Sequence, residues 1–351
     1  MKLSRRGFCA LAGSAVPFAH ASGLLLAGGL RSSDPDSLLK PMRLKRGDSV
    51  GLISPGGAIA RRSDVGVVQN TLRALGLNGV LGRNALARRG YLAGTDADRA
   101  ADVNAMFADT RIDAVLALRG GWGCNRILPL LDYDVIRSNP KVLMGYSDVT
   151  SLLVALYARC GLVSFHGPVG ISTWNSATRD YVRRILFDAE AVKMTNPRRV
   201  GPSRVQVRDR IHTITAGKAR GRLIGGNLSV LVSMMGSEYL PDWDGAILFL
   251  EDTDEAVYRI DRMLTHLSLA GVLPKLAGIV FGKCTDCDPE GNHGSLTLNQ
   301  VFDDHLKPLG IPAWYGAMIG HINDKFTVPV GVEAEIDSAA GTITMLEPAV
   351  R

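Results

Sequence analysis

The sequence predicts an α/β protein with an N-terminal domain built on a parallel sheet and a mixed, strand-rich α/β domain after it. The main observation is that short, continuously apolar strands alternate with helices in the first half, which is typical of a parallel sheet covered on both faces. A second observation is a change of rhythm near residue 195, after which strand-like runs dominate. The length of 351 residues also fits about two domains.

Each predicted element rests on a local pattern. Helices are predicted where apolar residues recur every three to four positions, over residues 64–75, 98–107, 124–131, 149–160, 228–235 and 258–270. Strands are predicted where short apolar runs lie between glycine, proline or polar residues, at 48–53, 114–118, 142–144, 163–165, 211–216, 221–224, 246–250 and 278–282, with a closing hairpin of 334–337 and 342–345.

The domain boundaries follow from composition. Residues 1–30 are predicted to be a signal peptide and leader, and residues 31–195 to be the N-terminal domain. The segment Asn196-Pro197-Arg198-Arg199-Val200-Gly201-Pro202 is rich in residues that break regular structure, so we predict a linker over 196–210. Residues 211–351 then form the C-terminal domain.

The N-terminus has the pattern of an export signal. It contains Ser4-Arg5-Arg6-Gly7-Phe8, then an apolar stretch from Cys9 to Phe18, then Ala19-His20-Ala21. A basic start, a short apolar region and an A-x-A end are typical of a secretory signal, and the arginine pair indicates the twin-arginine pathway. The alternative is a basic start on an apolar first helix. The apolar stretch is too short for a permanent anchor, so we expect a periplasmic protein without a stable membrane anchor.

Composition excludes several classes of protein. With 46% hydrophobic and 21% charged residues, the chain has room for a sizeable core and is not disordered. The net charge is +6, but the sequence contains no cluster of basic residues of the kind that binds nucleic-acid phosphates. Nucleic acid is therefore not an expected partner. Cys284 and Cys287 form a single CxxC pair without a second pair at zinc spacing. We therefore favour a local disulfide or two free thiols over a metal site.

Ser147 lies at the end of a predicted strand, where open α/β sheets bind their ligands. It follows Gly145 and precedes a helix, and a serine on such a strand-to-helix turn exposes its hydroxyl. The second glycine of the usual G-x-S-x-G pattern is replaced by Val149. The alternative for Ser147 is a helix N-cap.

Two further residues could supply the carboxylate and the histidine base that a serine nucleophile needs. Glu251 ends the strand at 246–250 and leads an acidic run, for which the alternatives are a solvated turn that caps the next helix and a divalent-cation site. His321 lies in a loop, where the alternative is a histidine that hydrogen-bonds a turn. In a triad, histidine takes the serine proton and a carboxylate orients the histidine.

The segments around these residues closely resemble the L,D-carboxypeptidase family of serine peptidases, which includes the muramoyl-tetrapeptide carboxypeptidases and the microcin C immunity peptidases. The resemblance runs in family order from about residue 44 to 345. It is carried by Val50-Gly51-Leu52-Ile53-Ser54-Pro55, Ala117-Leu118-Arg119-Gly120-Gly121-Trp122-Gly123, Met144-Gly145-Tyr146-Ser147-Asp148-Val149-Thr150, Phe165-His166-Gly167-Pro168, Gly225-Gly226-Asn227-Leu228, Phe249-Leu250-Glu251-Asp252, Tyr258-Arg259-Ile260-Asp261-Arg262-Met263-Leu264, Gly320-His321 and Thr327-Val328-Pro329-Val330-Gly331.

The resemblance implies a fold, an activity and a site. It implies an N-terminal domain like the class I glutamine amidotransferases, and a homodimer. It implies Ser147 as nucleophile, Glu251 as triad carboxylate and His321 as base, with no metal or organic cofactor. The implied reaction cuts the amide between meso-diaminopimelate and a C-terminal D-Ala in murein tetrapeptides through an acyl-enzyme. Because the familiar family members recycle murein in the cytoplasm, the export signal here points instead to periplasmic murein or released muropeptide.

Other site residues are predicted from chemistry alone. The backbone N–H groups of Asp148 and Gly121 are expected to form an oxyanion hole, with the Asp148 side chain capping its helix. Arg259 and Lys283 are candidates for binding a substrate carboxylate, and Trp174 is a candidate stacking residue whose alternative is surface packing.

Three other functions stay open at this point. One is a serine carboxypeptidase that acts on a peptidyl-nucleotide. Another is a non-catalytic muropeptide-binding protein that kept the scaffold. The third is an amidotransferase-like cysteine hydrolase, which needs a cysteine where this chain has Ser147.

Overall fold

The computed structural model describes residues 38–198, 205–287 and 294–351. The predicted signal peptide and leader, residues 1–30, lie outside the described residues, as does the middle of the predicted linker at 196–210. Within the described ranges, no helix has the length and apolar character needed to cross a membrane.

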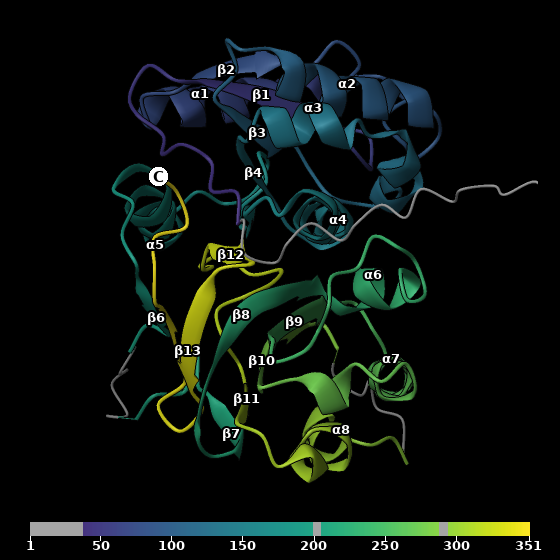
Figure 1. Ribbon diagram of the computed structural model, residues 1–351, viewed down its shortest axis with the longest axis vertical. Coiled ribbons are helices and arrows are strands. Elements are labelled where there is room, and N and C mark those ends of the chain that lie inside the picture. The colour runs from purple at the N-terminus through teal and green to yellow at the C-terminus, as the bar shows by residue number, and fades with distance from the viewer. Residues whose placement is uncertain (1–37, 199–204, 288–293) are drawn as a thin grey trace, which may run out of the picture. The chain divides into compact units, whose positions relative to one another are not determined.

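The first sheet has six strands in the order β12-β5-β4-β3-β1-β2 (Figure 1). Strands β1 to β5 pair in parallel, and β12 joins the edge antiparallel to β5. This confirms the predicted parallel sheet. The strands are β1 (Ser49–Ile53), β2 (Asn78–Leu81), β3 (Ala114–Ala117), β4 (Val142–Gly145), β5 (Ser164–His166) and β12 (Val328–Val330).

The α-helices of this part are α1 (Arg62–Ala74), α2 (Asp96–Ala108), α3 (Tyr133–Ser138), α4 (Thr150–Cys160) and α5 (Ser176–Val182). Three of them, α1, α2 and α4, begin and end close to the predicted positions 64–75, 98–107 and 149–160, whereas α3 and α5 were not predicted from the sequence. The predicted helix at 124–131 is a 3₁₀ helix over Cys124–Leu130, which contains Pro129. Proline has no N–H to donate within an α-helix, so the tighter, shorter helix is the better fit for this segment.

The second sheet is mixed, as predicted, and has eight strands in the order β6-β14-β13-β8-β9-β10-β11-β7. Strands β8 to β11 are parallel, and the others pair antiparallel. The strands are β6 (Lys193–Thr195), β7 (His212–Thr215), β8 (Lys218–Asn227), β9 (Ile247–Thr253), β10 (Gly278–Thr285), β11 (Ala313–Tyr315), β13 (Glu333–Asp337) and β14 (Thr342–Met345), and the helices are α6 (Leu228–Ser233), α7 (Val257–Leu269) and α8 (Leu298–His305).

The two sheets exchange strands. β6 precedes residue 196 but joins the second sheet beside β14, whereas β12 comes late in the chain but joins the first sheet beside β5. Pro329 lies within β12, and a proline is tolerated there because β12 is an edge strand. The chain therefore passes between the sheets more than once.

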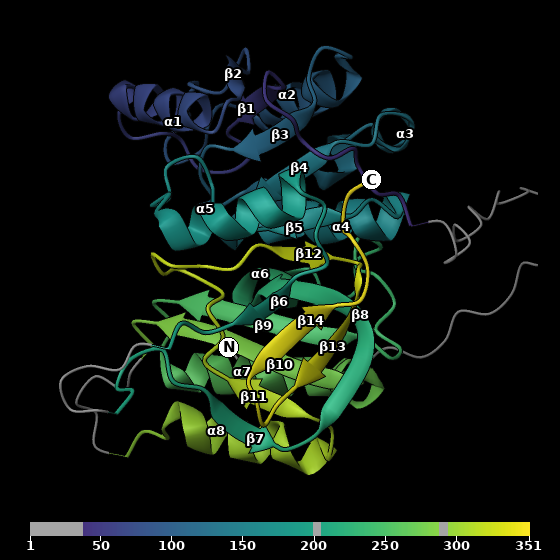
Figure 2. The ribbon, with the colours of Figure 1, turned by 90° about the vertical axis from the view of Figure 1, so that its left-hand side faces the viewer.

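Helix α4 lies between the two sheets in both views (Figures 1 and 2), and it contacts both β5 and β8. Most of its side chains are buried, because it is covered on opposite sides. The contact with β8 depends on Gly226, where an added Cβ would lie 2.5 Å from the side chain of Thr150. This close packing brings the carboxyl end of β8 to the start of α4, three residues after Ser147.

Candidate active site

Ser147 occupies a strained turn between β4 and α4. Its φ of 64° lies in the left-handed region, which a residue with a Cβ rarely adopts. Gly145 permits the turn, because an added Cβ would lie 2.8 Å from the side chain of Val149. Val149, which replaces the second glycine of the G-x-S-x-G pattern, therefore packs against Gly145, the first glycine. Neither this turn nor α4 has a side-chain N-cap, so the N-cap alternative for Ser147 is wrong.

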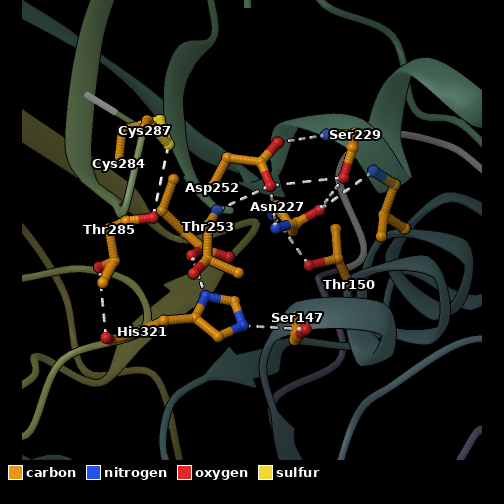
Figure 3. A network of polar contacts seen from close by, with 12 residues as sticks. Ser147, Thr150, Asn227, Ser229, Asp252, Thr253, Cys284, Thr285, Cys287 and His321 are labelled. Atoms are coloured by element: carbon orange, nitrogen blue, oxygen red, sulfur yellow. Dashed lines mark hydrogen bonds and ion pairs between the residues drawn. A yellow bond between two sulfur atoms is a disulfide. The ribbon is translucent and has the colours of Figure 1, made fainter. Parts of the chain in front are cut away.

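Ser147, His321 and Glu251 form one chain of hydrogen bonds, part of which is drawn in Figure 3. Ser147 Oγ lies 3.1 Å from His321 Nε2, and His321 Nδ1 lies 2.8 Å from Glu251 Oε2. The sequence separates these residues widely, yet the structure brings all three together. Since the histidine ring bonds both neighbours, it does not serve merely to close a turn.

The His321 loop is held from two sides. Thr285, at the end of β10, donates its hydroxyl to the carbonyl of His321 at 3.2 Å. On the other side, Thr178 donates to the carbonyl of Asn323 at 3.0 Å and accepts from the N–H of Lys325 at 3.2 Å. Both halves of the chain therefore position the imidazole.

Gly320 allows the loop to pass close to the carboxylate. Its φ is +124°, and an added Cβ would lie 3.0 Å from Glu251 Oε2. A side chain at this position would compete with the imidazole of His321 for the same carboxylate oxygen. The glycine before the histidine is therefore required by space as well as by backbone conformation.

Glu251 is fully buried on β9. Burial alone would raise its pKa, but the hydrogen bond and charge of His321, together with His166, more than offset burial and lower the pKa. The carboxylate therefore stays ionised beside the histidine, as a carboxylate that stabilises an imidazolium must. It is neither a solvated turn nor a cap, since α7 begins without a side-chain cap.

Two further carboxylates of the acidic run, Asp252 and Glu255, also have structural partners. Asp252 points away from Glu251, as successive strand residues do, and accepts hydrogen bonds from the Asn227 side chain and the Ser229 N–H (Figure 3). Glu255 pairs with Arg259 at 3.5 Å. In the described part of the chain, no group of three metal-ligating side chains exists.

Three residues beside the Ser147–His321–Glu251 hydrogen-bond chain were not predicted as site residues from the sequence. The Tyr146 ring stands edge-on to His321 with centroids 4.8 Å apart, and Lys325 Nζ lies 4.0 Å from the centre of the Tyr146 ring. Burial lowers the pKa of Lys325 to about 8, while the charge of Glu251 opposes this shift. His166 is fully buried, and burial lowers its pKa to about 4. The only sequence signal was their nearness to Ser147, His321 or a strand end.

The predicted oxyanion-hole donors are free to bind a ligand. Neither the N–H of Asp148 nor that of Gly121 has an acceptor in the described structure. Gly120 lies against Ser147, since an added Cβ would be 2.9 Å from Ser147 Cβ. The peptide bond that joins Gly120 to Gly121 therefore passes close to Ser147.

The prediction that the Asp148 side chain caps its own helix is wrong. Its carboxylate instead accepts the N–H of Cys124 at 2.9 Å, at the start of the 3₁₀ helix that follows β3. This bond links the Ser147 turn to the loop that contains Gly120 and Gly121. Burial raises the pKa of Asp148, in spite of these backbone donors.

The three substrate-binding candidates lie in different surroundings, and the carbonyl of Lys283 lies near Gly320 of the His321 loop, 3.3 Å from the position of an added Cβ. The indole of Trp174 packs against the core and donates to the carbonyl oxygens of Val169 and Gly170, each at 3.1 Å, which corresponds to the packing alternative. Arg259 is exposed on α7 beside Tyr258 and Glu255. Lys283 is half-buried on β10, and burial lowers its pKa.

The cysteines take structural roles. Cys284 and Cys287 form a disulfide at the end of β10, next to Thr285 (Figure 3). Cys124 and Cys160 are buried, and burial raises the pKa of Cys124 well above its usual value and that of Cys160 to about 11. A protonated, buried thiol is a poor nucleophile, so the cysteine-hydrolase alternative has no candidate nucleophile among the described residues.

Comparison with known families shows which family the chain belongs to. Residues 50–167 match the LD-carboxypeptidase N-terminal domain, and residues 220–336 match the LD-carboxypeptidase C-terminal domain. These matches define an enzyme of the serine-type carboxypeptidase class. The chain belongs to the LD-carboxypeptidase family.

Individual relatives cover most of the chain. A probable murein peptide carboxypeptidase of Bacillus subtilis is 37% identical over 86% of this chain and 93% of its own length. The murein tetrapeptide carboxypeptidase of Pseudomonas aeruginosa is 34% identical over 82% of this chain and 92% of its own length.

Solved structures have the same fold. The microcin C7 self-immunity protein MccF, in complex with glutamyl sulfamoyl guanosine, superposes with a TM-score of 0.80 at 27% identity and covers 89% of this chain and 100% of its own. A muramoyltetrapeptide carboxypeptidase from Oxalobacter formigenes has a TM-score of 0.72 at 29% identity, over 84% and 97% of the two chains.

Proposed function

We propose that this enzyme is an L,D-carboxypeptidase that releases the C-terminal D-Ala of murein tetrapeptides by cutting the amide after meso-diaminopimelate. The observation that carries the proposal is the hydrogen-bond chain from Ser147 through His321 to the buried Glu251. The names of the Bacillus subtilis and Pseudomonas aeruginosa relatives support murein peptide as the substrate.

The proposed reaction begins at Ser147. Its Oγ attacks the carbonyl carbon of the scissile amide, and its proton passes to His321 Nε2, 3.1 Å away. Glu251 holds the opposite ring nitrogen and stabilises the imidazolium that forms. The negative charge that develops on the carbonyl oxygen is bound by the N–H groups of Asp148 and Gly121.

The second half of the reaction regenerates the serine. His321 gives its proton to the nitrogen of the leaving D-Ala, the C–N bond breaks, and an ester to Ser147 remains. A water molecule then attacks this ester while His321 accepts its proton, and the C–O bond to Ser147 breaks as the hydroxyl is reprotonated. The products are the tripeptide acid and free D-Ala.

The proposal includes the location and assembly of the enzyme. The twin-arginine pattern at Arg5 and Arg6 supports export of the folded protein to the periplasm, without a stable membrane anchor. A homodimer is proposed from the family resemblance alone. In the periplasm, the substrate is murein or released muropeptide.

A second candidate is a carboxypeptidase for peptidyl-nucleotides. It is favoured by the high structural similarity to MccF, whose complexes contain aminoacyl sulfamoyl nucleosides. The non-catalytic muropeptide-binding alternative has less support, since the Ser–His–Glu chain is intact.

Mass spectrometry separates these functions. The mature protein is incubated with murein tri-, tetra- and pentapeptides and, separately, with aspartyl sulfamoyl adenosine. The proposal expects the tetrapeptide to lose one alanine while the other peptides stay intact. Cleavage of aspartyl sulfamoyl adenosine without loss of alanine from the tetrapeptide supports a carboxypeptidase for peptidyl-nucleotides. If neither substrate is cleaved, the result supports a non-catalytic binding protein.

A further inference from the structure

A cavity of about 460 Å³ lies beside the proposed nucleophile. The residues that line it include two glycines, two aromatic residues and two arginines: Gly57, Gly121, Tyr91, Trp122, Arg88 and Arg119. Cavities of this size bind ligands much larger than a single amino acid. The mechanism described above leaves this cavity without a role.

The aromatic side chains of the cavity are unusually exposed. Tyr91 is 68% exposed and Trp122 is 52% exposed, whereas most large apolar side chains of this chain are buried in the core. An exposed tryptophan or tyrosine presents a flat, rigid surface that gains contact area at little cost in conformational entropy when a ligand covers it. The two rings therefore form a ready contact surface for a peptide.

Among the described residues, no carboxylate pairs with either arginine of the cavity. Arg88 donates to the carbonyl of Ile59 at 2.8 Å, and Arg119 donates to the carbonyl of Ala58 at 3.1 Å. Arg119 Nε is buried and has no hydrogen-bond partner among the described residues. None of the described residues that line the cavity is acidic. A guanidinium with free donors matches a carboxylate best, because both are planar and can form two parallel hydrogen bonds.

The cavity is connected to the reacting centre through two adjacent glycines. Gly121 lines the cavity, while the neighbouring Gly120 lies against Ser147. The N–H of Gly57 donates to the carbonyl of Gly120 at 3.0 Å, which fixes this loop to the cavity wall. Only Gly120 therefore separates the cavity residue Gly121 from Ser147, so a ligand in the cavity lies close to the proposed nucleophile.

We propose that this cavity binds the acyl side of the substrate, the part before the scissile amide, through a free carboxylate held by Arg88 and Arg119 and through contact with Tyr91 and Trp122. The inference rests on the proposed function and adds a substrate requirement to it. The peptide offers two such carboxylates: one on the side chain of diaminopimelate, and one on the γ-linked glutamate that precedes it. The leaving D-Ala is too small to fill a cavity of this volume.

Binding can be measured without turnover in the Ser147→Ala variant, which retains the cavity. Calorimetry compares a tetrapeptide containing meso-diaminopimelate with one containing L-lysine at the same position, since these differ by one carboxylate. A third peptide carries an amide in place of the free glutamate carboxylate. The peptide that lacks the bound carboxylate should bind about 10- to 100-fold more weakly, and the comparison identifies which carboxylate is bound.

The arginines are then removed one at a time. Arg88→Gln or Arg119→Gln is added to the Ser147→Ala variant. Either change should weaken binding of the peptide that has both carboxylates by a similar factor. Binding of the peptide that lacks the bound carboxylate should stay nearly unchanged. Arg88 is exposed, so its substitution leaves the core intact. Arg73→Gln, on the exposed face of α1, is the matched control and should change nothing. Trp122→Ala should weaken all three peptides alike.

The outcomes separate this inference from the proposed function. Equal binding of all three peptides, or a carboxylate dependence that survives in both arginine variants, would overturn the cavity assignment. Release of D-Ala by the unaltered enzyme tests the reaction by itself. A protein that binds the carboxylate through Arg88 and Arg119 but releases no D-Ala retains the cavity assignment and loses the proposed function.

Discussion

The Cβ position of Gly120 lies 2.9 Å from Cβ of Ser147 and 3.2 Å from its Oγ. A methyl group there would press on the side chain of Ser147, the proposed nucleophile. We therefore expect Gly120→Ala to lower kcat/KM by roughly 100-fold, because a displacement of about 1 Å at a reacting group has an effect of this size. Steady-state kinetics of D-Ala release measures the change.

Gly66→Ala is the matched control for this substitution. Gly66 lies in α1, where an added Cβ meets no atom within 4 Å. Its kcat/KM should equal that of the unaltered enzyme, and the protein should gain about 0.5–1 kcal/mol in stability from the better helix former. Equal activity of the two alanine variants would show that Gly120 does not restrain the nucleophile.

The backbone strain at Ser147 predicts an effect on stability. At a φ of 64°, a residue with a Cβ is disfavoured relative to glycine. Ser147→Gly should therefore be more stable than Ser147→Ala by about 1 kcal/mol, although both lack the hydroxyl. Chemical denaturation of the two variants provides the comparison.

At an ordinary helix position, glycine should be less stable than alanine, the opposite of the order expected at Ser147. Ala105 is exposed within α2, and Ala105→Gly is expected to lose about 0.5–1 kcal/mol. If glycine destabilises both positions alike, the left-handed conformation of Ser147 is not a source of strain.

His166 predicts a dependence of stability on pH. Its burial, aided by the charges of His321 and Lys325 and opposed by Glu251, lowers its pKa from a usual 6.5 to about 4. Between these values the unfolded chain binds a proton that the folded chain does not. The free energy of unfolding should therefore fall as the pH drops from 6.5 to 4, by about 3 kcal/mol in total from this residue.

His166→Phe isolates this contribution. Neither ring nitrogen of His166 has a hydrogen-bond partner in the described structure, and the ring stands edge-on to Phe249. The phenyl ring cannot take up the proton in either state. The stability of the variant relative to the unaltered protein should thus rise as the pH falls from 6.5 to 4. Parallel pH curves for the two proteins would contradict the assignment.

The sequence predicted the elements that local patterns define. The elbow at Ser147 and the strand end at Glu251 are readable because an apolar run followed by a polar residue marks the carboxyl end of a buried strand. The parallel sheet follows from the same runs. Strand β12 was missed because it has three residues and contains Pro329, so neither its length nor its composition is typical of a strand.

Contacts between distant segments could not be predicted in this way. Local sequence favours a hydrogen bond from the Asp148 carboxylate to the nearby N–H groups of its own helix. The carboxylate instead accepts the N–H of Cys124, because two loops pack together. Lys325 lies over the ring of Tyr146, and its backbone N–H is bound by Thr178, a residue far away in the sequence. Tertiary packing decides both contacts.

Export depends on Arg5 and Arg6 if the twin-arginine assignment is correct. Changing this pair to lysines keeps the charge of the signal but removes the side chains that the pathway recognises. We expect the protein to accumulate in the cytoplasm, as measured by cell fractionation. Equal periplasmic amounts of both forms would argue for a different export route.

The proposed triad predicts a common loss of activity. Ser147→Ala, His321→Ala and Glu251→Gln should each fold and lose roughly 10⁴-fold or more in kcat. The reason is that a serine hydroxyl is a weak nucleophile without its base, and the base is held by Glu251 at 2.8 Å. Circular dichroism and a melting curve check folding, and kinetics of D-Ala release measures the loss.

Because the three residues act as a unit, their effects should not add. A Ser147→Ala/His321→Ala double variant should be hardly slower than either single variant, since removal of one member already stops the proton transfer. A phosphonylating reagent should add mass at Ser147 in the unaltered enzyme and fail to do so in His321→Ala. If Ser147→Ala released D-Ala at nearly the original rate, the nucleophile would be another residue, and the hydrogen-bond chain to Glu251 would have only a structural role.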